Sequence, residues 1–218
     1  MKTFAKLSGL LCTTVAICSV ASTAAADNLV TNGGFENPNL APGTWSWFDE
    51  DTDVEGWKLL NEDSTIEIRN NVSGTAYEGN QFAEIDSHRY TAKAGESMGF
   101  FQDIMTTVGK KYKLSFAFGP RNNVNGDNLF KVTFGDMWKE MDAGNSNGGW
   151  QLFSDTITAT SDTTRLQFEL MGKYDTLGAN IDDVHVTAVP EPFSLLGLAA
   201  IGTVGAAGIA RKRQAAQG

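Results

Sequence analysis

Cysteine and histidine are scarce in this 218-residue chain. The two cysteines, Cys12 and Cys18, both fall in an apolar N-terminal stretch, so the rest of the chain has no disulfide, no thiol nucleophile and no cysteine-ligated zinc. The two histidines, His88 and His185, are too few for a multi-histidine metal centre. No Gly-x-Ser-x-Gly elbow, His-Glu-x-x-His motif or phosphate-binding loop is present. These absences lead us to expect a protein that is not an enzyme.

Basic residues are also few in the body of the chain. Residues 27–190 carry 12 lysines and arginines against 25 aspartates and glutamates, a formal net charge near −13. Such a surface repels nucleic acid and anionic lipid and attracts cations. We therefore expect no nucleic-acid partner.

The N-terminus has the features of a secretory signal peptide. Lys2 and Lys6 precede a mostly apolar stretch over residues 7–20, and Ala24-Ala25-Ala26 supplies a small-residue cleavage site. Removal of residues 1–26 would leave Asp27 as the first mature residue.

The C-terminus has three parts in a fixed order: Val189-Pro190-Glu191-Pro192, an uncharged run of 18 residues over 193–210, and Arg211-Lys212-Arg213. As a helix the run would reach about 27 Å, close to the bilayer core of about 30 Å. A basic cluster after a transmembrane helix stays cytoplasmic and leaves the upstream chain outside. Residues 214–218 form a short tail.

This arrangement resembles the PEP-CTERM sorting signal of Gram-negative bacteria over residues 189–213. The resemblance implies an inner-membrane-anchored precursor, held by a transient C-terminal helix, that the secretion machinery exports and an exosortase cleaves. It also implies a final location at the cell surface or in the extracellular matrix, beside exopolysaccharide production. The alternative is a plain single-span anchor in which Pro-Glu-Pro occurs by chance.

Residues 27–188 read as one all-β domain. Apolar residues alternate with polar ones in Tyr112–Phe118, Phe130–Phe134 and Leu166–Leu170, and more weakly around Ile66, Ile157 and Val184. Turn signals such as Asn32-Gly33-Gly34 and Asn125-Gly126-Asp127 separate these segments, and no amphipathic helix is evident. About nine or ten short strands predict a jelly-roll β-sandwich, with long loops at 39–53 and 121–128.

The order of motifs in this body resembles the galactose-binding-like jelly rolls, which include calcium-containing carbohydrate-binding modules and a related plant cell-wall family. The motifs are Asn28 to Glu36, Gly56-Trp57, Glu78 to Asp86, Phe101 to Ile104, Gly109 with Tyr112 to Phe116, and Ile181 to Val184. The resemblance implies a sandwich with adjacent termini and one structural calcium that joins the first and last strands.

The residues themselves suggest how calcium would be held. Calcium prefers six to eight oxygen ligands, and Glu36 follows a Gly-Gly pair that permits a tight turn. Strand alternation places Asp182 on the core face with Val184, where a carboxylate is costly unless it is paired or bound to a cation. With the resemblance, this predicts Ca²⁺ bound by Glu36 and Asp182, with Asp183 as the substitute for Asp182. The alternative is that all three are ordinary turn and edge residues.

Tryptophans provide the candidate carbohydrate site. Trp57 and Trp150 begin strand-like segments and are expected in the core, whereas Trp45 and Trp47 alternate with polar residues in the 39–53 loop and can face one way. Exposed aromatic faces suit stacking on sugar rings. Trp45 and Trp47 are therefore the predicted sugar platform, unless that loop folds down over the sandwich.

Arg121 is the remaining candidate. It can hydrogen-bond a sugar, or it can form an internal ion pair with Glu84 or Asp86, which we consider the better use.

Together these features predict an exported, non-catalytic β-sandwich that binds polysaccharide at the cell surface or in the matrix. One alternative is a structural or adhesive matrix protein without sugar binding, and a second is a small glycan-active hydrolase or esterase. Asp86, Ser87 and His88 are suggestive of the latter only on paper, because strand neighbours point apart.

Overall fold

The computed structural model describes residues 27–190, apart from 90–92, 94, 122–125 and 145–148. Its described residues form eleven strands and no helix: β1 (Trp45–Phe48), β2 (Lys58–Leu59), β3 (Ile66–Asn70), β4 (Gln81–Glu84), β5 (Gly99–Met105), β6 (Lys111–Gly119), β7 (Leu129–Phe134), β8 (Met137–Asp142), β9 (Gln151–Thr158), β10 (Thr163–Leu170) and β11 (Asn180–Ala188). Within these described ranges no helix is long and apolar enough to cross a membrane.

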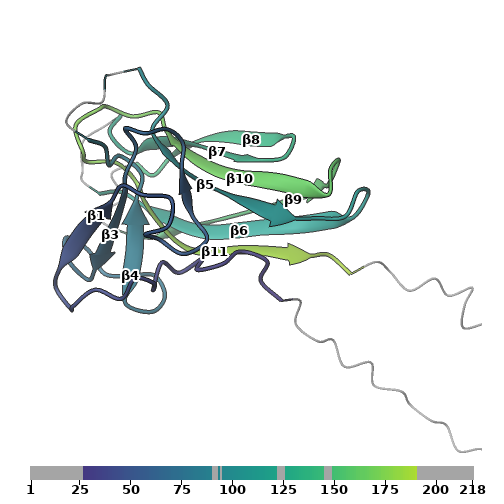
Figure 1. The fold of residues 1–218 in the computed structure, drawn as a ribbon, viewed down its shortest axis with the longest axis horizontal. Coiled ribbons are helices and arrows are strands. Elements are labelled where there is room, and N and C mark those ends of the chain that lie inside the picture. Colours follow the sequence, from purple (N-terminus) through teal and green to yellow (C-terminus); the bar gives the residue numbers. More distant parts are fainter. Residues whose placement is uncertain (1–26, 90–92, 94, 122–125, 145–148, 191–218) are drawn as a thin grey trace, which may run out of the picture.

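The strands form two antiparallel sheets that pack face to face as a jelly-roll sandwich (Figure 1). The first has the order β1-β3-β4-β11-β6-β9 and the second β2-β5-β10-β7-β8. The predicted all-β jelly roll is therefore confirmed. The predicted segments 1–26 and 191–218, which include the signal peptide, Glu191-Pro192, the transmembrane run and the basic cluster, lie outside the described residues.

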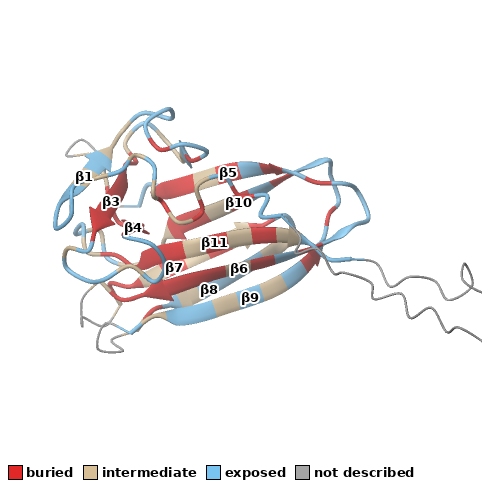
Figure 2. Ribbon diagram, turned by 90° about the horizontal axis from the view of Figure 1, so that it is seen from below, coloured by how far each residue is buried: buried red, intermediate tan, exposed pale blue. Residues whose placement is uncertain are grey.

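The core lies between the sheets and is built by the period of two that the sequence shows. Phe116 of β6, Phe130 and Val132 of β7 and Phe168 of β10 are all fully buried. Among the described residues, every member of the buried cluster lies between Val30 and Val186. Exposed residues concentrate on edge strands such as β1 and β9 (Figure 2).

The N-terminal segment lies along β11, which brings the two ends of the domain together (Figure 1). Leu29 N donates to Val186 O at 2.8 Å, and the side chain of Asn28 bonds both Val184 O and Val186 N. The adjacent termini that the resemblance implied are present.

The loop prediction for residues 39–53 was wrong in its centre, because β1 occupies Trp45–Phe48. Prolines, glycines and acids around this segment gave a loop signal, yet Trp45 to Phe48 pair antiparallel with Arg69 to Ile66 of β3. Both β1 and the two-residue β2 pair at sheet edges, which raises the strand number to eleven.

The predicted orientation of Asp182 was also wrong. Ile181 and Val184 are both core residues although they are three positions apart, because the register of β11 against β6 shifts between Asp182 and His185. Asp183 has φ 51° in this bulge. Asp182 lies opposite Ala117, away from the core cluster, and is buried there because the loop containing Tyr77 and Glu78 crosses over it.

Candidate functional sites

A groove of about 500 Å³ runs beside β1, and the tryptophans of that strand form one wall. Trp45 and Trp47 both line it and remain 54% and 51% exposed. Because residues two apart in a strand share a face, both rings lie on the same side of the edge strand. The prediction that they face one way therefore agrees with their position, although they lie on a strand and not in a loop.

Polar residues complete the groove: Asp49, Glu67, Ser87, His88, Arg89 and Thr176. Arg89 Nη2 forms an ion pair with Asp49 Oδ2 at 2.9 Å and also donates to the Asp49 carbonyl at 3.0 Å. One aromatic wall together with hydrogen-bonding groups in the same groove forms the kind of site that holds a ring carrying several hydroxyls.

A buried ionic network supports the groove from below. Arg69, only 2% exposed, pairs with both Glu67 and Glu84, and it lies opposite Trp45 in the β1–β3 register. Arg121 Nε donates to Glu84 Oε2 at 3.2 Å, so the internal ion pair predicted for Arg121 is present, and Arg121 does not line the groove.

Glu84 is the deepest member of that network. Burial raises the pKa of Glu84 to about 8, against the opposing effect of Arg69 and Arg121. The backbone N–H of Gly178 also donates to its carboxylate at 2.8 Å.

A histidine–carboxylate pair adjoins the groove. His88 Nδ1 lies 3.2 Å from Asp86 Oδ1, and the His88 ring stacks on Tyr174 with centroids 3.6 Å apart. Burial raises the pKa of Asp86, whose other oxygen accepts from the N–H groups of Asp175 and Leu177. The Ser87 hydroxyl instead bonds Thr65 at 2.5 Å, so Asp86, Ser87 and His88 do not form a triad.

The predicted calcium ligands Glu36 and Asp182 both lie near Gly34 and bind the same loop. Glu36 Oε1 accepts from the N–H groups of Asn80 and Gln81, at 2.6 and 2.9 Å. Asp182 Oδ2 accepts from those of Tyr77 and Glu78, at 2.8 and 3.0 Å. A Cβ on Gly34 would lie about as far from Glu36 Cγ (3.9 Å) as from Asp182 Oδ1 (4.0 Å).

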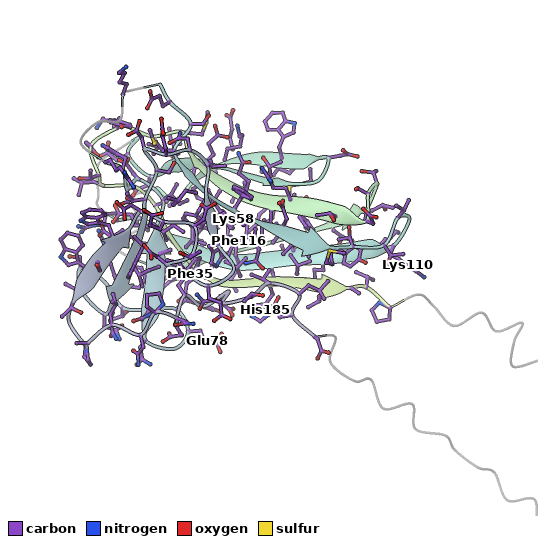
Figure 3. All side chains as sticks on the ribbon, in the orientation of Figure 1. Phe35, Lys58, Glu78, Lys110, Phe116 and His185 are labelled. Atoms are coloured by element: carbon purple, nitrogen blue, oxygen red, sulfur yellow. The ribbon has the colours of Figure 1, made fainter. Side chains whose placement is uncertain are left out.

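Asp183 turns toward a different group. Its Oδ1 lies 2.7 Å from His185 Nε2, and together with Glu78 these residues place three ligand-type atoms within 4.8 Å of one another. Figure 3 shows Glu78 and His185 side by side near β11. A side-chain hydrogen bond with Asp183, followed by the repulsion of its charge, raises the pKa of Glu78.

The carboxylates of Glu36, Asp182 and Asp183 are oxygen ligands of the kind that a hard cation prefers. Burial raises the pKa of Asp182 to about 7, and the charge of Asp183 makes a smaller contribution. Among the described residues that contact Asp182, no lysine or arginine neutralises its charge. Oxygen ligands with uncompensated negative charge fit Ca²⁺ and would disfavour a soft metal.

The remaining tryptophans lie apart from the groove. Trp57 is fully buried as predicted, whereas Trp150 is half-buried on the outside of β4, where its ring meets Phe82 edge-on and its Nε1 donates to Thr75 O. Trp138 of β8 is 62% exposed on the other sheet. Sequence reasoning did not single it out, although its neighbours Lys139 and Glu140 mark a solvent-facing edge strand.

No protein-family model and no curated protein sequence matches the chain. Solved structures with similar strand arrangements include a CBM4 module, 17% identical with a TM-score of 0.40, which covers 73% of this chain and 99% of that one. The CBM22-1 xylan-binding domain of Paenibacillus barcinonensis Xyn10C is 11% identical, with a TM-score of 0.40 and coverage of 70% and 99%. Arabinose-bound MgGH51 α-L-arabinofuranosidase is 10% identical, with a TM-score of 0.49 and coverage of 74% and 26%. Such values do not establish a shared function.

Proposed function

We propose that this protein is an exported, non-catalytic polysaccharide-binding protein whose binding site is the groove lined by Trp45 and Trp47. The single observation that carries the proposal is the pair of half-exposed indole rings on one face of an edge strand, beside a groove of about 500 Å³. Large exposed aromatic surface is costly in water and usually marks an interaction site.

The groove favours a sugar over a purely apolar ligand because its other walls are polar. Sugar rings have apolar faces that stack on indole and hydroxyl edges that hydrogen-bond. Glu67 and Asp49 offer acceptors and Arg89 offers donors. Asp49 is held by its ion pair with Arg89, and Glu67 by its ion pair with the buried Arg69.

Glycan binding tests the proposal directly. Residues 27–190 should bind the exopolysaccharide of the source organism or members of a glycan array, and Trp45→Ala with Trp47→Ala should weaken binding at least tenfold. Both rings are half-exposed, so we expect the double variant to keep most of its stability. Replacing a core tryptophan by alanine typically lowers the free energy of unfolding by about 3–5 kcal/mol. A loss of that size in the double variant would show that the two rings are structural.

Trp138→Ala is the matched control, because it removes an exposed indole from the opposite sheet. It should leave binding unchanged. Loss of binding in this variant alone would move the site to the outer face of the five-stranded sheet.

Two rival functions give different results in the same experiments. A structural or adhesive matrix protein would bind no glycan in any variant. A glycan-active hydrolase or esterase would release reducing sugar or acid during prolonged incubation, whereas a binding protein releases neither.

We also propose that the protein holds a structural Ca²⁺ through Glu36 and Asp182, with Asp183 as the substitute for Asp182. When bound, the cation would supply positive charge to a buried carboxylate. Glu36 and Asp182 already hold the loop 77–81 through its N–H groups, and this orients them from the first and last parts of the domain.

Export forms the last part of the proposal. We propose that residues 1–26 and 191–218 act as the signal peptide and the sorting segment, and that an exosortase releases the body to the cell surface or matrix of a Gram-negative bacterium.

A further inference from the structure

A second hollow, of about 380 Å³, adjoins the groove beside β1. Asp49 and Arg89 line both, so their ion pair forms the boundary between them. A chain-like ligand that stacks on Trp45 or Trp47 can therefore extend past Asp49 into the second hollow.

The second hollow differs from the first in charge. Four of its seven lining residues are acidic, Asp49, Glu50, Asp51 and Glu62, and the others are Leu59, Asn61 and Arg89. Arg89 is the one basic residue among them, and Asp49 already pairs with it. Three carboxylates, those of Glu50, Asp51 and Glu62, are left without a basic partner among the residues that line the hollow.

These three carboxylates are accessible to a ligand. Glu50, Asp51 and Glu62 are all exposed, and one oxygen of Asp51 accepts from the Leu59 N–H at 3.0 Å, which fixes its side chain. An aromatic wall in one part and unpaired negative charge in the next select a ligand with ring faces and positive charge along its length.

We infer that the groove binds a polysaccharide of amino sugars with free, protonated amines. This inference rests on the proposed glycan-binding function and names the class of glycan. Uronic acid polymers fit poorly, since their carboxylates would meet Glu50, Asp51 and Glu62 while Arg89 is already paired. A neutral glycan would stack on the tryptophans but leave the acidic hollow without a partner.

Two probes of equal length separate charge from ring shape: glucosamine oligosaccharides with free amines, and their fully N-acetylated counterparts. At a pH below the amine pKa, residues 27–190 should bind the free-amine form roughly fivefold to a hundredfold more tightly, as expected from a few exposed ion pairs. Added salt should reduce this preference, because it screens exposed charges.

Glu50→Gln with Glu62→Gln removes two of the unpaired charges while it keeps side-chain size. This variant should lose most of the preference and bind the N-acetylated probe as the wild type does. The control is Asp136→Asn with Glu140→Gln, which makes the same change in net charge at exposed positions next to and on β8. The control should keep the preference.

The outcomes are distinguishable. If neither probe nor any other glycan binds, the proposed function fails together with the inference. If both probes bind equally, or the N-acetylated or a uronate oligomer binds more tightly, glycan binding stands and the amino-sugar inference is overturned. If both double variants lose the preference equally, general net charge and not the second hollow sets it, and this also overturns the inference.

Discussion

Glu84 is the most deeply buried member of the ionic network next to the groove. It is fully buried, it accepts from Arg69, Arg121 and the Gly178 N–H, and it faces Glu67 across the β3–β4 pair. Removing one partner of such a network leaves a buried charge without compensation, which typically costs about 3–5 kcal/mol. Trp45 is the partner of Arg69 in the β1–β3 register, which links this network to the groove.

The raised pKa of Glu84 predicts a dependence of stability on pH. In the unfolded chain the carboxyl titrates near 4.5, and in the folded protein near 8, chiefly because of burial. Between these values the folded state binds more protons than the unfolded state, so this group makes the free energy of unfolding fall as pH rises, by up to about 1.4 kcal/mol per pH unit. Thermal melts from pH 5 to pH 8 measure it.

Glu84→Gln should make that slope shallower, because glutamine does not titrate in this range; the raised pKa of Asp182, about 7, accounts for part of the slope that remains. Glu140→Gln, an exposed change on β8, should leave the slope as in the wild type. A wild-type stability that instead increases over this range would show that Arg69 and Arg121 outweigh the effect of burial.

Single residues differ in how well the sequence predicted them. The burial of Trp57 and the pairing of Arg121 with Glu84 followed from their places at strand starts and strand ends, which neighbouring strands bring together. Asp182 is buried because a loop more than a hundred positions earlier in the chain, Tyr77 to Gln81, covers it. Local alternation contains no information about such a covering loop.

At the scale of elements, β1 shows how tertiary pairing overrides local signals. Its four residues sit between a Pro-Gly turn and an acidic run, both typical of loops. The chain is held extended there by pairing with β3, and the two tryptophans favour a strand at a sheet edge.

The bulge in β11 is the second departure from a regular pattern. A one-residue insertion reverses which face each later side chain occupies. In the sequence, Asp182 and Asp183 look like two successive positions of a regular strand, so the pattern gives no sign of the bulge at Asp183. Its left-handed φ of 51° is a conformation that aspartate tolerates better than most residues.

The N-terminal segment and β11 pack so closely that only glycine fits at position 33. A Cβ there would overlap the Val184 carbonyl, while Val184 N donates to Gly33 O at 3.0 Å. Gly33→Ala should therefore separate the two segments and lower the melting temperature by several degrees. Differential scanning calorimetry of residues 27–190 measures the change.

Gly34→Ala provides the neighbouring control. Its added Cβ would lie 3.9 Å from the nearest atom, Glu36 Cγ, which is ordinary contact. Equal losses in both variants would mean that backbone freedom, and not the close approach to Val184, sets the cost at position 33.

At the scale of the whole molecule, the sandwich determines how close to β11 a protease can cut the C-terminal segment without removing part of a sheet. Among the described residues, the last backbone hydrogen bond runs from Val189 N to Lys111 O, just after β11 ends at Ala188. Cleavage after that bond leaves both sheets intact. We predict that mass spectrometry of exported protein finds a chain that starts at Asp27 and ends near 190–192; a mass that includes residues 193–210 would contradict exosortase processing.

The cysteine-free body has no covalent link between its two ends, and calcium would add to the hydrogen bonds that join them. Glu36 and Asp182 hold the loop 77–81 from the first and last parts of the domain, so a cation between carboxylates of this region would join segments about 145 positions apart. A ligand bound only by the folded state at a hundredfold excess over its Kd stabilises it by about 2.7 kcal/mol. For a domain of this size that corresponds to a melting-temperature shift of about 5–10 °C.

Chelator should therefore lower the melting temperature of residues 27–190 by this amount, and added calcium should restore it. Glu36→Gln and Asp182→Asn should each remove the response to calcium, whereas Glu140→Gln should respond like the wild type. Calorimetry with and without chelator, together with metal analysis of the purified protein, makes the measurement. If wild-type melting does not change and no metal copurifies, Glu36 and Asp182 stabilise the loop through its N–H groups alone, and the termini are joined without a cation.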